Sequence, residues 1–382
     1  MRILFLNAYV PPSDAPASRL IADLAGALAA AGHEVSFLGN RSGYRDRRQT
    51  GLASRALGEL ARMLGILAGG VFRKRPDLIV ATTSPPLLPA IAGLVAGRHG
   101  TRFILWAMDL YPEIPIAIGL MKAGHPLVRL TGKLNRIARR RCERIIALDA
   151  AMVRRLEPST EGIPLHSQLP WPLPEHLGSS SPEFPSEPPG KTWLYSGNLG
   201  RVHEWKCLLE AQHRLEERFG AEAPTLVFQG GGAQFEPARR EAARLELTRC
   251  RFRPHRSDAD LLPELLGASV VVATQRPETA GMLWPSKLAL LLRVDRPLLW
   301  IGPENDAVAA RVREGKAAAF LPDQTDAIAD WVAARAEGPI GDSMGFDHEI
   351  ASARRKEALE EWLAWIGIEP IPGCHNGAPR PR

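Results

Sequence analysis

The sequence predicts an α/β fold with two domains, each built on a doubly wound parallel sheet. Three observations lead to this prediction. The chain has 382 residues, which is more than one ordinary hydrophobic core holds. Short apolar runs alternate with helix-length amphipathic stretches, as in successive βαβ units. The alternation stops in residues 158–190, which contain nine prolines, and then starts again.

The individual elements follow from this alternation. In the first half, apolar runs predict strands at 3–7, 34–38, 77–82, 102–107 and 144–148. Between the first two lies Ser18–Ala31, whose apolar residues share one helical face and which ends at Gly32, so we predict a helix there. In the second half, strands are predicted at 192–196, 225–229, 268–274, 297–301 and 318–321, and a last helix over Asp347–Ile366.

These elements divide the chain into five parts. We predict an N-terminal Rossmann-like domain over 1–160, a Pro/Ser-rich linker over 161–190, a C-terminal Rossmann-like domain over 191–345, a final helix over 346–367 and a disordered tail over 368–382. Ligands of doubly wound sheets bind outside the carboxyl ends of the strands. The loops that follow the strands are therefore the places to search for a functional site.

Composition excludes several classes of protein. The four cysteines are scattered, without a CxxC pair or a histidine at metal-ligand spacing, which favours reduced thiols and a cytoplasmic setting. No apolar run reaches the roughly 18–20 residues that span a bilayer. Met1–Val10 is apolar but ends at two prolines, so we interpret it as a buried strand rather than a signal peptide.

Charge is distributed unevenly along the chain. Residues 1–160 contain 23 Lys/Arg and 11 Asp/Glu, a net charge of +12, so the remaining residues carry −6. The basic half predicts an anionic partner, unless the arginines only cover a solvated surface. Arg45–Arg75 and Leu127–Arg144 hold most of the basic groups and favour an anionic membrane surface. Nucleic acid is disfavoured, because the basic stretches lack interleaved aromatic residues and any known binding motif.

The first strand of the second half leads into a glycine-rich turn, Ser196-Gly-Asn-Leu-Gly200. Glycines let a backbone approach phosphate, and a following helix offers its N-terminal N–H groups. We therefore predict an anion site at Gly197, Asn198 and Gly200, with Arg201 and His203 as further donors. An ordinary strand-to-helix turn is the alternative.

A second loop, Gly281-Met-Leu-Trp-Pro-Ser-Lys287, comes before a predicted helix. Lys287 can act as a point charge on a diphosphate. Ser286 can cap the helix or donate to a phosphate oxygen. The alternative for the lysine is a solvated surface group.

Acidic residues follow the fourth strand of the first half. Asp109 and Glu113 can orient hydroxyl groups by strong hydrogen bonds, and Asp109 can act as a base. The alternative is a carboxylate that caps the next helix, which suits Glu113 better. Ser13, Asp14 and Arg19 lie on the loop after the first strand and are predicted to meet an acceptor.

Taken in order, four motifs make the chain resemble family-4 retaining glycosyltransferases over about residues 1–340. They are Tyr9–Arg19, Tyr195–Gly200, Asp109–Glu113 with Ile118-Gly-Leu120, and Gly281–Lys287 with Arg296-Pro297. The resemblance is strongest to the branch that builds bacterial capsules, O-antigens and colanic-type exopolysaccharides. It implies a GT-B fold, an acceptor site in the first domain, a nucleotide-sugar site in the second and a last helix that crosses back.

The resemblance also implies the chemistry. We expect metal-independent transfer of a hexosyl or N-acetylhexosaminyl group, with retention, from a nucleotide-diphosphate sugar, with a UDP-sugar favoured. Asp109 and Glu113 would be catalytic, and Gly281, Ser286 and Lys287 would bind the donor together with the glycine-rich turn. The basic segments of the first half, rather than the resemblance, point to a lipid-linked acceptor, on a polyprenyl diphosphate, and to a protein peripheral to the inner face of the plasma membrane.

Two of the departures from the family pattern lie in the third loop. Many members carry two glutamates in the third loop, one of which holds the ribose, and these positions are Met282 and Leu290 here. Neither side chain accepts a hydrogen bond from a ribose hydroxyl. This keeps two alternatives open: a catalytically weak homologue that binds a nucleotide sugar or a partner enzyme, and a sugar-nucleotide epimerase of the same fold.

Overall fold

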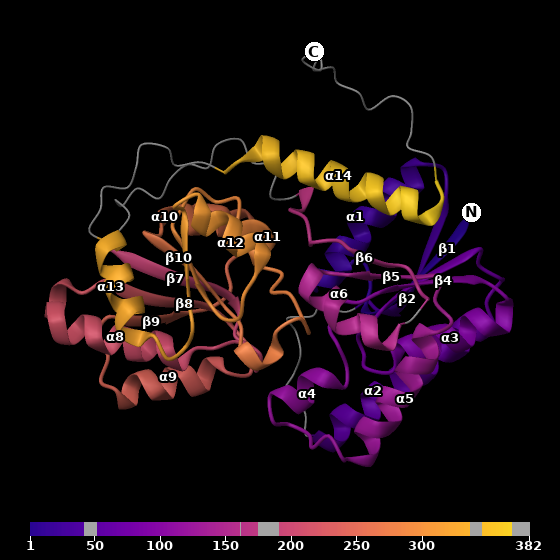
Figure 1. Cartoon of the computed structure of the whole chain (residues 1–382), viewed down its shortest axis with the longest axis horizontal. Coiled ribbons are helices and arrows are strands. Elements are labelled where there is room, and N and C mark those ends of the chain that lie inside the picture. Colours follow the sequence, from indigo (N-terminus) through magenta and orange to yellow (C-terminus); the bar gives the residue numbers. More distant parts are fainter. Residues whose placement is uncertain (42–51, 161, 175–190, 337–345, 369–382) are drawn as a thin grey trace, which may run out of the picture.

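The computed structural model describes residues 1–41, 52–160, 162–174, 191–336 and 346–368. Most of the predicted linker and nearly all of the predicted tail lie outside these residues. Figure 1 shows two α/β units side by side, each with a twisted sheet between helices, and helix α14 running along both.

The first unit contains a six-stranded parallel sheet with strand order β2-β1-β3-β4-β5-β6. The central strands β3 and β4 are almost wholly buried, as apolar runs covered by helices on both faces should be. The strands are β1 (Arg2–Tyr9), β2 (Glu34–Asn40), β3 (Leu78–Thr82), β4 (Arg102–Trp106), β5 (Arg144–Ala147) and β6 (Leu165–Ser167).

Helices connect these strands in the usual order of a doubly wound fold. They are α1 (Pro16–Ala30), α2 (Leu52–Val71), α3 (Leu88–His99), α4 (Glu113–Ala117), α5 (Pro126–Arg139) and α6 (Ala150–Leu156), followed by the 3₁₀ turn Glu157–Ser159. Helix α3 packs against both α2 and α5. The switch in strand order falls between β1 and β3, so the loops after these two strands border the expected ligand position.

The second unit repeats the architecture with strand order β12-β11-β10-β7-β8-β9, again all parallel. Its switch point lies between β7 and β10. The strands are β7 (Thr192–Asn198), β8 (Thr225–Gly231), β9 (Cys250–Arg253), β10 (Val270–Thr274), β11 (Leu298–Ile301) and β12 (Ala317–Phe320).

The helices of this unit cover both faces of its sheet. They are α8 (Lys206–Phe219), α9 (Phe235–Arg244), α10 (Asp258–Gly267), α11 (Leu288–Leu291), α12 (Asp306–Arg313) and α13 (Thr325–Ala336), with 3₁₀ turns at Gly220–Glu222 and Pro277–Thr279. Both sheets and the helix pattern confirm the fold class predicted from the sequence.

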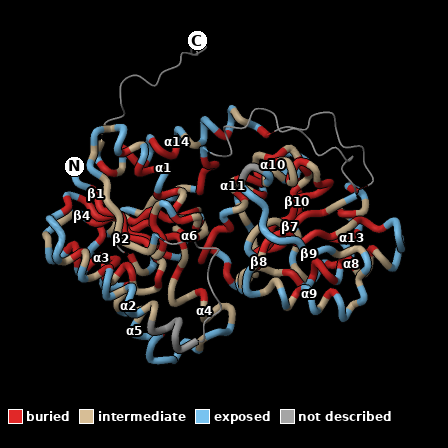
Figure 2. Tube along the Cα trace, turned by 180° about the vertical axis from the view of Figure 1, so that it is seen from behind, coloured by how far each residue is buried: buried red, intermediate tan, exposed pale blue. Residues whose placement is uncertain are grey.

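Buried residues form the centre of each unit, as the red segments of Figure 2 show. One cluster of buried apolar side chains extends from the first sheet across the contact between the units and includes Met282, Leu283 and Leu290 of the second. A separate cluster fills the other side of the second sheet. The two units therefore share apolar packing rather than touching only through polar side chains.

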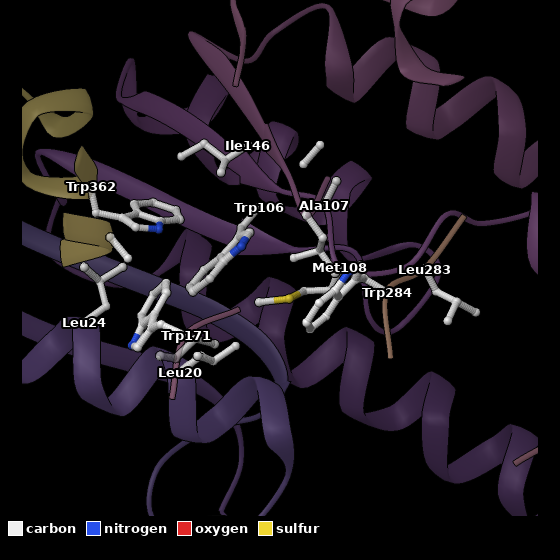
Figure 3. Close-up of a cluster of buried hydrophobic side chains, with 14 of the residues drawn as sticks. Leu20, Leu24, Trp106, Ala107, Met108, Ile146, Trp171, Leu283, Trp284 and Trp362 are labelled. Carbon is white, nitrogen blue, oxygen red and sulfur yellow. The ribbon is translucent and has the colours of Figure 1, made fainter. Parts of the chain in front are cut away.

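Helix α14 (His348–Ile366) returns from the second unit to the first, as the resemblance implied. Trp362 on this helix packs against Trp106 of β4 with ring centroids 4.5 Å apart, and Trp171 also stacks on Trp106, at 5.9 Å (Figure 3). Buried aromatic surface of this size contributes strongly to stability. It fixes the helix on the first sheet.

A polar contact supports the same packing. Asp23 of α1 is almost fully buried, and its carboxylate accepts hydrogen bonds from Arg355 Nε and Nη2 at 2.8 and 2.6 Å and from Trp171 Nε1 at 2.8 Å. A buried carboxylate is tolerated only when charge and hydrogen bonds compensate its lost hydration. We call this group the Asp23 latch.

Two strands were not predicted. Strand β6 lies within the proline-rich stretch assigned to the linker, so the first sheet continues beyond residue 160. Strand β9 has the sequence CRFR and no buried residue. Both lie at sheet edges, where a strand needs little apolar surface, and hydrophobic patterning therefore misses them.

Candidate active site

The switch point of the second sheet brings two loops together, one after β7 and one after β10. His203 Nδ1 donates a hydrogen bond to the Thr274 carbonyl oxygen at 2.7 Å. The backbone N–H of Arg276 donates to the Val202 carbonyl oxygen at 2.8 Å. The glycine-rich turn and the Gly281–Lys287 loop therefore border one place, where the fold directs ligands.

Glycines near the ends of β7 and β8 leave the backbone there without side chains. Gly197 has φ +122°, and Gly230 beside it has φ +144°. A Cβ on Gly230 would lie 2.1 Å from the Gly197 carbonyl oxygen, so only glycine fits there. Asn198 is exposed and Gly200 half-buried, so this part of the turn is accessible to a ligand.

The helix after this turn differs from the prediction. Helix α8 begins at Lys206, six residues beyond Gly200, and not directly after the turn. The Glu204 carboxylate accepts hydrogen bonds from the N–H groups of Trp205 and Lys206 at 3.1 and 3.2 Å. The protein's own carboxylate therefore occupies the helix N-terminus that the sequence analysis assigned to phosphate.

Lys287 lies at the centre of the site. Its Nζ is 3.4 Å from the centroid of the Tyr195 ring and about as close to Gly197, where an added Cβ would lie 3.5 Å away. The Nζ atom is buried, and within the described residues it has no hydrogen-bond partner. Burial holds the pKa of Lys287 well below its usual range. Because burial disfavours the charged form of Lys287, an anion bound beside Nζ would restore it, which makes this place a candidate anion site.

The neighbouring predicted donors take different positions. Arg201 and Ser286 are exposed, so both side chains are free to turn toward a ligand. His203 is half-buried, and its Nδ1 proton is committed to the Thr274 carbonyl, which leaves Nε2 as an acceptor in the neutral ring. Burial, together with the charge of Lys287, lowers the pKa of His203 to about 3. A neutral His203 suits a hydroxyl group better than a phosphate oxygen.

The loop after β4 meets the second unit directly. The backbone N–H of Leu110 donates to the Met282 carbonyl oxygen at 2.8 Å, and Asp109 forms an isolated antiparallel bridge with Leu283. Gly281 packs so closely on the first unit that a Cβ would lie 2.8 Å from the Ala151 carbonyl oxygen. The acidic loop and the lysine loop are therefore adjacent, as the prediction of a shared site requires.

Asp109 is held through its backbone. Its N–H donates to Thr83 Oγ1 at 2.9 Å, and the N–H of Met108 donates to the same oxygen at 3.1 Å. Within the described residues, the Asp109 carboxylate has no ion pair, and burial raises its pKa to about 6. A carboxyl group with such a pKa changes protonation state near neutral pH, which suits a base or a hydrogen-bonding group at a reacting centre.

Glu113 begins helix α4, and one of its carboxylate oxygens is buried without a hydrogen bond in the described part of the chain. Arg139 of α5 is also buried, and burial lowers its pKa while the charge of Glu113 opposes this. Nearby, Asn135 Nδ2 donates to the carbonyl oxygens of Pro86 and Tyr111 at 2.9 and 3.0 Å. Asn135 of α5 therefore ties the acidic loop, through Tyr111, to the loop that carries Pro86.

The predicted acceptor residues lie at the switch point of the first sheet. Ser13 is buried, and its Oγ has no hydrogen bond within the described residues. Asp14 and Arg19 are half-buried, the latter on helix α1. The Ala8 N–H donates to the Ser84 carbonyl oxygen at 2.8 Å and joins the loops after β1 and β3. The acceptor role of these three residues stays a prediction.

Met282 and Leu290 are buried members of the apolar cluster that crosses between the units. Their side chains pack where a glutamate pair would offer hydrogen bonds. Within the described residues, no group of three His, Cys, Asp or Glu is placed to hold a metal ion.

Three residues of the site were not predicted: Tyr195, Thr83 and Asn135. Tyr195 belongs to the motif Tyr195–Gly200, but the sequence pattern predicts only another apolar residue of a buried strand at this position. Thr83 and Asn135 carry no sequence signal, because their roles arise only when distant loops meet.

The architecture places the chain among proteins of the GT-B fold. HepE of Anabaena, solved in complex with UDP-glucose, matches with a TM-score of 0.65 and 15% identity over 96% of this chain and 99% of its own. WaaG, a glycosyltransferase involved in lipopolysaccharide biosynthesis, matches with a TM-score of 0.62 and 14% identity over 95% and 99%. At these identities the likeness concerns the fold.

A curated relative is similar in sequence as well. The protein named "Probable glycosyltransferase WbjE", from Pseudomonas aeruginosa, is 21% identical over 249 residues, which are 63% of this chain and 60% of the relative. The match thus spans less than two thirds of that protein. No family model matches the sequence. Each helix within the described residues is too short or too polar to cross a lipid bilayer.

Proposed function

We propose that the protein is a metal-independent glycosyltransferase that moves a sugar, with retention, from a nucleotide-diphosphate sugar to an acceptor. The observation that carries the proposal is the buried Lys287 Nζ, which has no hydrogen-bond acceptor among the described residues, at the switch point of the second sheet. A nucleotide diphosphate supplies the missing anion. In the reaction, the same cation stabilises the negative charge that develops on the leaving diphosphate.

The other half of the site supplies the reacting centre. Asp109 lies on the adjoining loop of the first unit, and its carboxylate is free of ion pairs in the described residues. We assign it to the acceptor or donor hydroxyls next to the transferred sugar, with Glu113 beside it at the start of α4. The division of labour is then donor recognition in the second unit and acceptor recognition in the first.

A UDP-sugar is the favoured donor. HepE was solved with UDP-glucose, and that protein shares this fold over nearly its whole length. A thermal-shift screen with UDP-, GDP-, dTDP- and CMP-sugars, followed by transfer and hydrolysis assays on the donor that binds, tests the proposal. Binding with turnover supports it; binding without turnover favours the catalytically weak homologue, which the buried Met282 and Leu290 make the second candidate. Epimerised donor in the same assay would indicate an epimerase.

We further propose that the acceptor is lipid-linked and that the first unit docks on an anionic membrane, as expected in cell-surface polysaccharide biosynthesis. Helices α2 and α5 flank α3 and present exposed apolar side chains beside exposed basic groups. The apolar ones include Leu64, Phe72, Leu127 and Leu130, and the basic ones include Arg73, Lys74, Arg75, Arg136, Arg140 and Arg141. Basic groups of this kind contribute about 1 kcal/mol each near an anionic surface.

Two side chains in these segments face inward and do not belong to the docking surface. Ile66 faces the core. Arg139, predicted to lie in the basic cluster, points inward below the acidic loop. Arg47 and Arg48 lie outside the described residues.

A further inference from the structure

The Lys287 ammonium lies over the face of the Tyr195 ring. A buried ammonium ordinarily requires hydrogen-bond acceptors, because it has lost its hydration. Within the described residues, Lys287 Nζ has none. The Tyr195 ring face, with its centroid 3.4 Å from Nζ, is well inside the distance of about 6 Å at which a ring attracts a cation.

The ring itself is held in one position. Tyr195 is 1% exposed, and its hydroxyl donates to the Asn198 carbonyl oxygen at 3.1 Å. Its ring packs against Phe228 at 5.8 Å between centroids and meets the edge of His203 at 6.1 Å. The hydroxyl contact also joins the ring to the glycine-rich turn, so the turn and the ring beside Lys287 are held to one another.

The other side of the lysine is bare backbone. A Cβ at Gly197 would approach Cε and Nζ of Lys287 at 3.4 and 3.5 Å, so the glycine leaves this side unobstructed. An aromatic ring differs from a carboxylate as a resting partner. A carboxylate would compete with phosphate for the ammonium, whereas a ring attracts it by only about 1–2 kcal/mol and bears no charge to be left unpaired.

We propose that Tyr195 is a positioning residue whose ring holds the Lys287 ammonium at the glycine-rich turn until a nucleoside diphosphate becomes its partner. This inference rests on the proposed function, since it takes a diphosphate as the ligand. It adds to that function a residue that touches neither donor nor acceptor and acts through the lysine.

The test measures UDP affinity by calorimetry for the wild type, Tyr195→Phe and Tyr195→Leu, each also in a Lys287→Ala background. We expect Tyr195→Phe to keep the dissociation constant within about twofold. Tyr195→Leu should raise it by up to about tenfold, because binding must then also order the lysine side chain at the turn. In the Lys287→Ala background neither change should have a further effect, because the two residues act as one unit.

A second series removes the attraction without removing the shape. Phenylalanine with three ring fluorines at position 195 keeps the packing but weakens the negative face of the ring. We expect UDP affinity to fall relative to Tyr195→Phe, while far-UV circular dichroism shows that the fold is kept.

The outcomes separate the two proposals. If the wild type binds no nucleoside diphosphate, the proposed function fails and takes this inference with it. If the wild type binds UDP and the leucine and fluorinated variants bind equally well, only the role of Tyr195 is overturned. Equal losses in the presence and absence of Lys287 would also overturn it, because they indicate a general structural role.

Discussion

Replacing Asp109 by asparagine should stabilise the protein at neutral pH and at the same time slow sugar transfer. The carboxylate is partly buried, and in the described part of the chain it has no ion pair to compensate its lost hydration. Asparagine keeps the shape and the backbone hydrogen bond to Thr83 but carries no charge. The ionised side chain of Asp109 therefore lowers the stability of the folded protein.

The magnitude follows from the pKa. Burial raises it from 3.8 to about 6 in the folded protein. Each pKa unit corresponds to about 1.4 kcal/mol, so the full penalty above both values is at most about 3 kcal/mol. Partial exposure of Asp109 reduces this, and we expect a gain of about 1–2 kcal/mol for Asp109→Asn at pH 8. Because the folded pKa is raised, the penalty is small below pH 4, grows between pH 4 and 6, and is complete at higher pH.

Urea unfolding of the wild type and Asp109→Asn at pH 4 and pH 8 measures this difference. Asp323→Asn is the matched control, since its carboxylate is exposed and should change stability at neither pH. Transfer by Asp109→Asn should fall about tenfold or more with an unchanged donor dissociation constant. A variant no more stable than the wild type at pH 8, or equally stabilised at pH 4, would refute the electrostatic argument; weakened donor binding would refute the catalytic assignment.

Three further predictions concern other parts of the molecule. Lys287→Ala should raise the dissociation constant for UDP about 5- to 150-fold, the value of a charge-assisted hydrogen bond, whereas the exposed Lys206→Ala should not; equal effects would contradict the site. Asp23→Ala should destabilise the protein by about 3 kcal/mol in urea unfolding, because it leaves Arg355 without its buried carboxylate; an unchanged midpoint would contradict the latch. Binding to phosphatidylglycerol vesicles should weaken between 0.1 and 1 M salt, because salt screens the basic groups. Phe72→Ser should reduce the binding that remains at 1 M salt, because this exposed side chain is apolar. Equal binding to neutral vesicles would contradict docking.

Most of the fold could be predicted because the interior strands are apolar runs bounded by turns. Strands β3 and β10 are wholly buried, and their sequences LIVAT and VVVAT fit no other element as well. The edge strands β6 and β9 lack this signature, since neither contains a buried residue. The crossing of α14 to the first unit came from the family resemblance and not from periodicity.

The site was predictable as loops but not as contacts. Sequence order placed the glycine-rich turn and Lys287 after strands of one sheet, and the switch in strand order then brought them together. The resting position of Lys287 on Tyr195 could not be predicted, because the two residues are far apart in the chain and tyrosine there satisfies the pattern of a buried strand. The same holds for Glu204, which occupies the start of α8.

The apolar residues at positions 282 and 290 now have a physical account. Both belong to the buried cluster that joins the units, and the main chain at 282 accepts the hydrogen bond from Leu110. The loop that carries Lys287 is therefore positioned by packing and backbone contacts that exist without a ligand. A glutamate at either position would need a polar partner in this apolar environment, at a cost of several kcal/mol if unpaired. Under the proposed function, donor recognition would therefore depend on the diphosphate beside Lys287 rather than on a ribose contact at positions 282 and 290, and the Leu110–Met282 hydrogen bond aligns the acidic loop with the lysine loop.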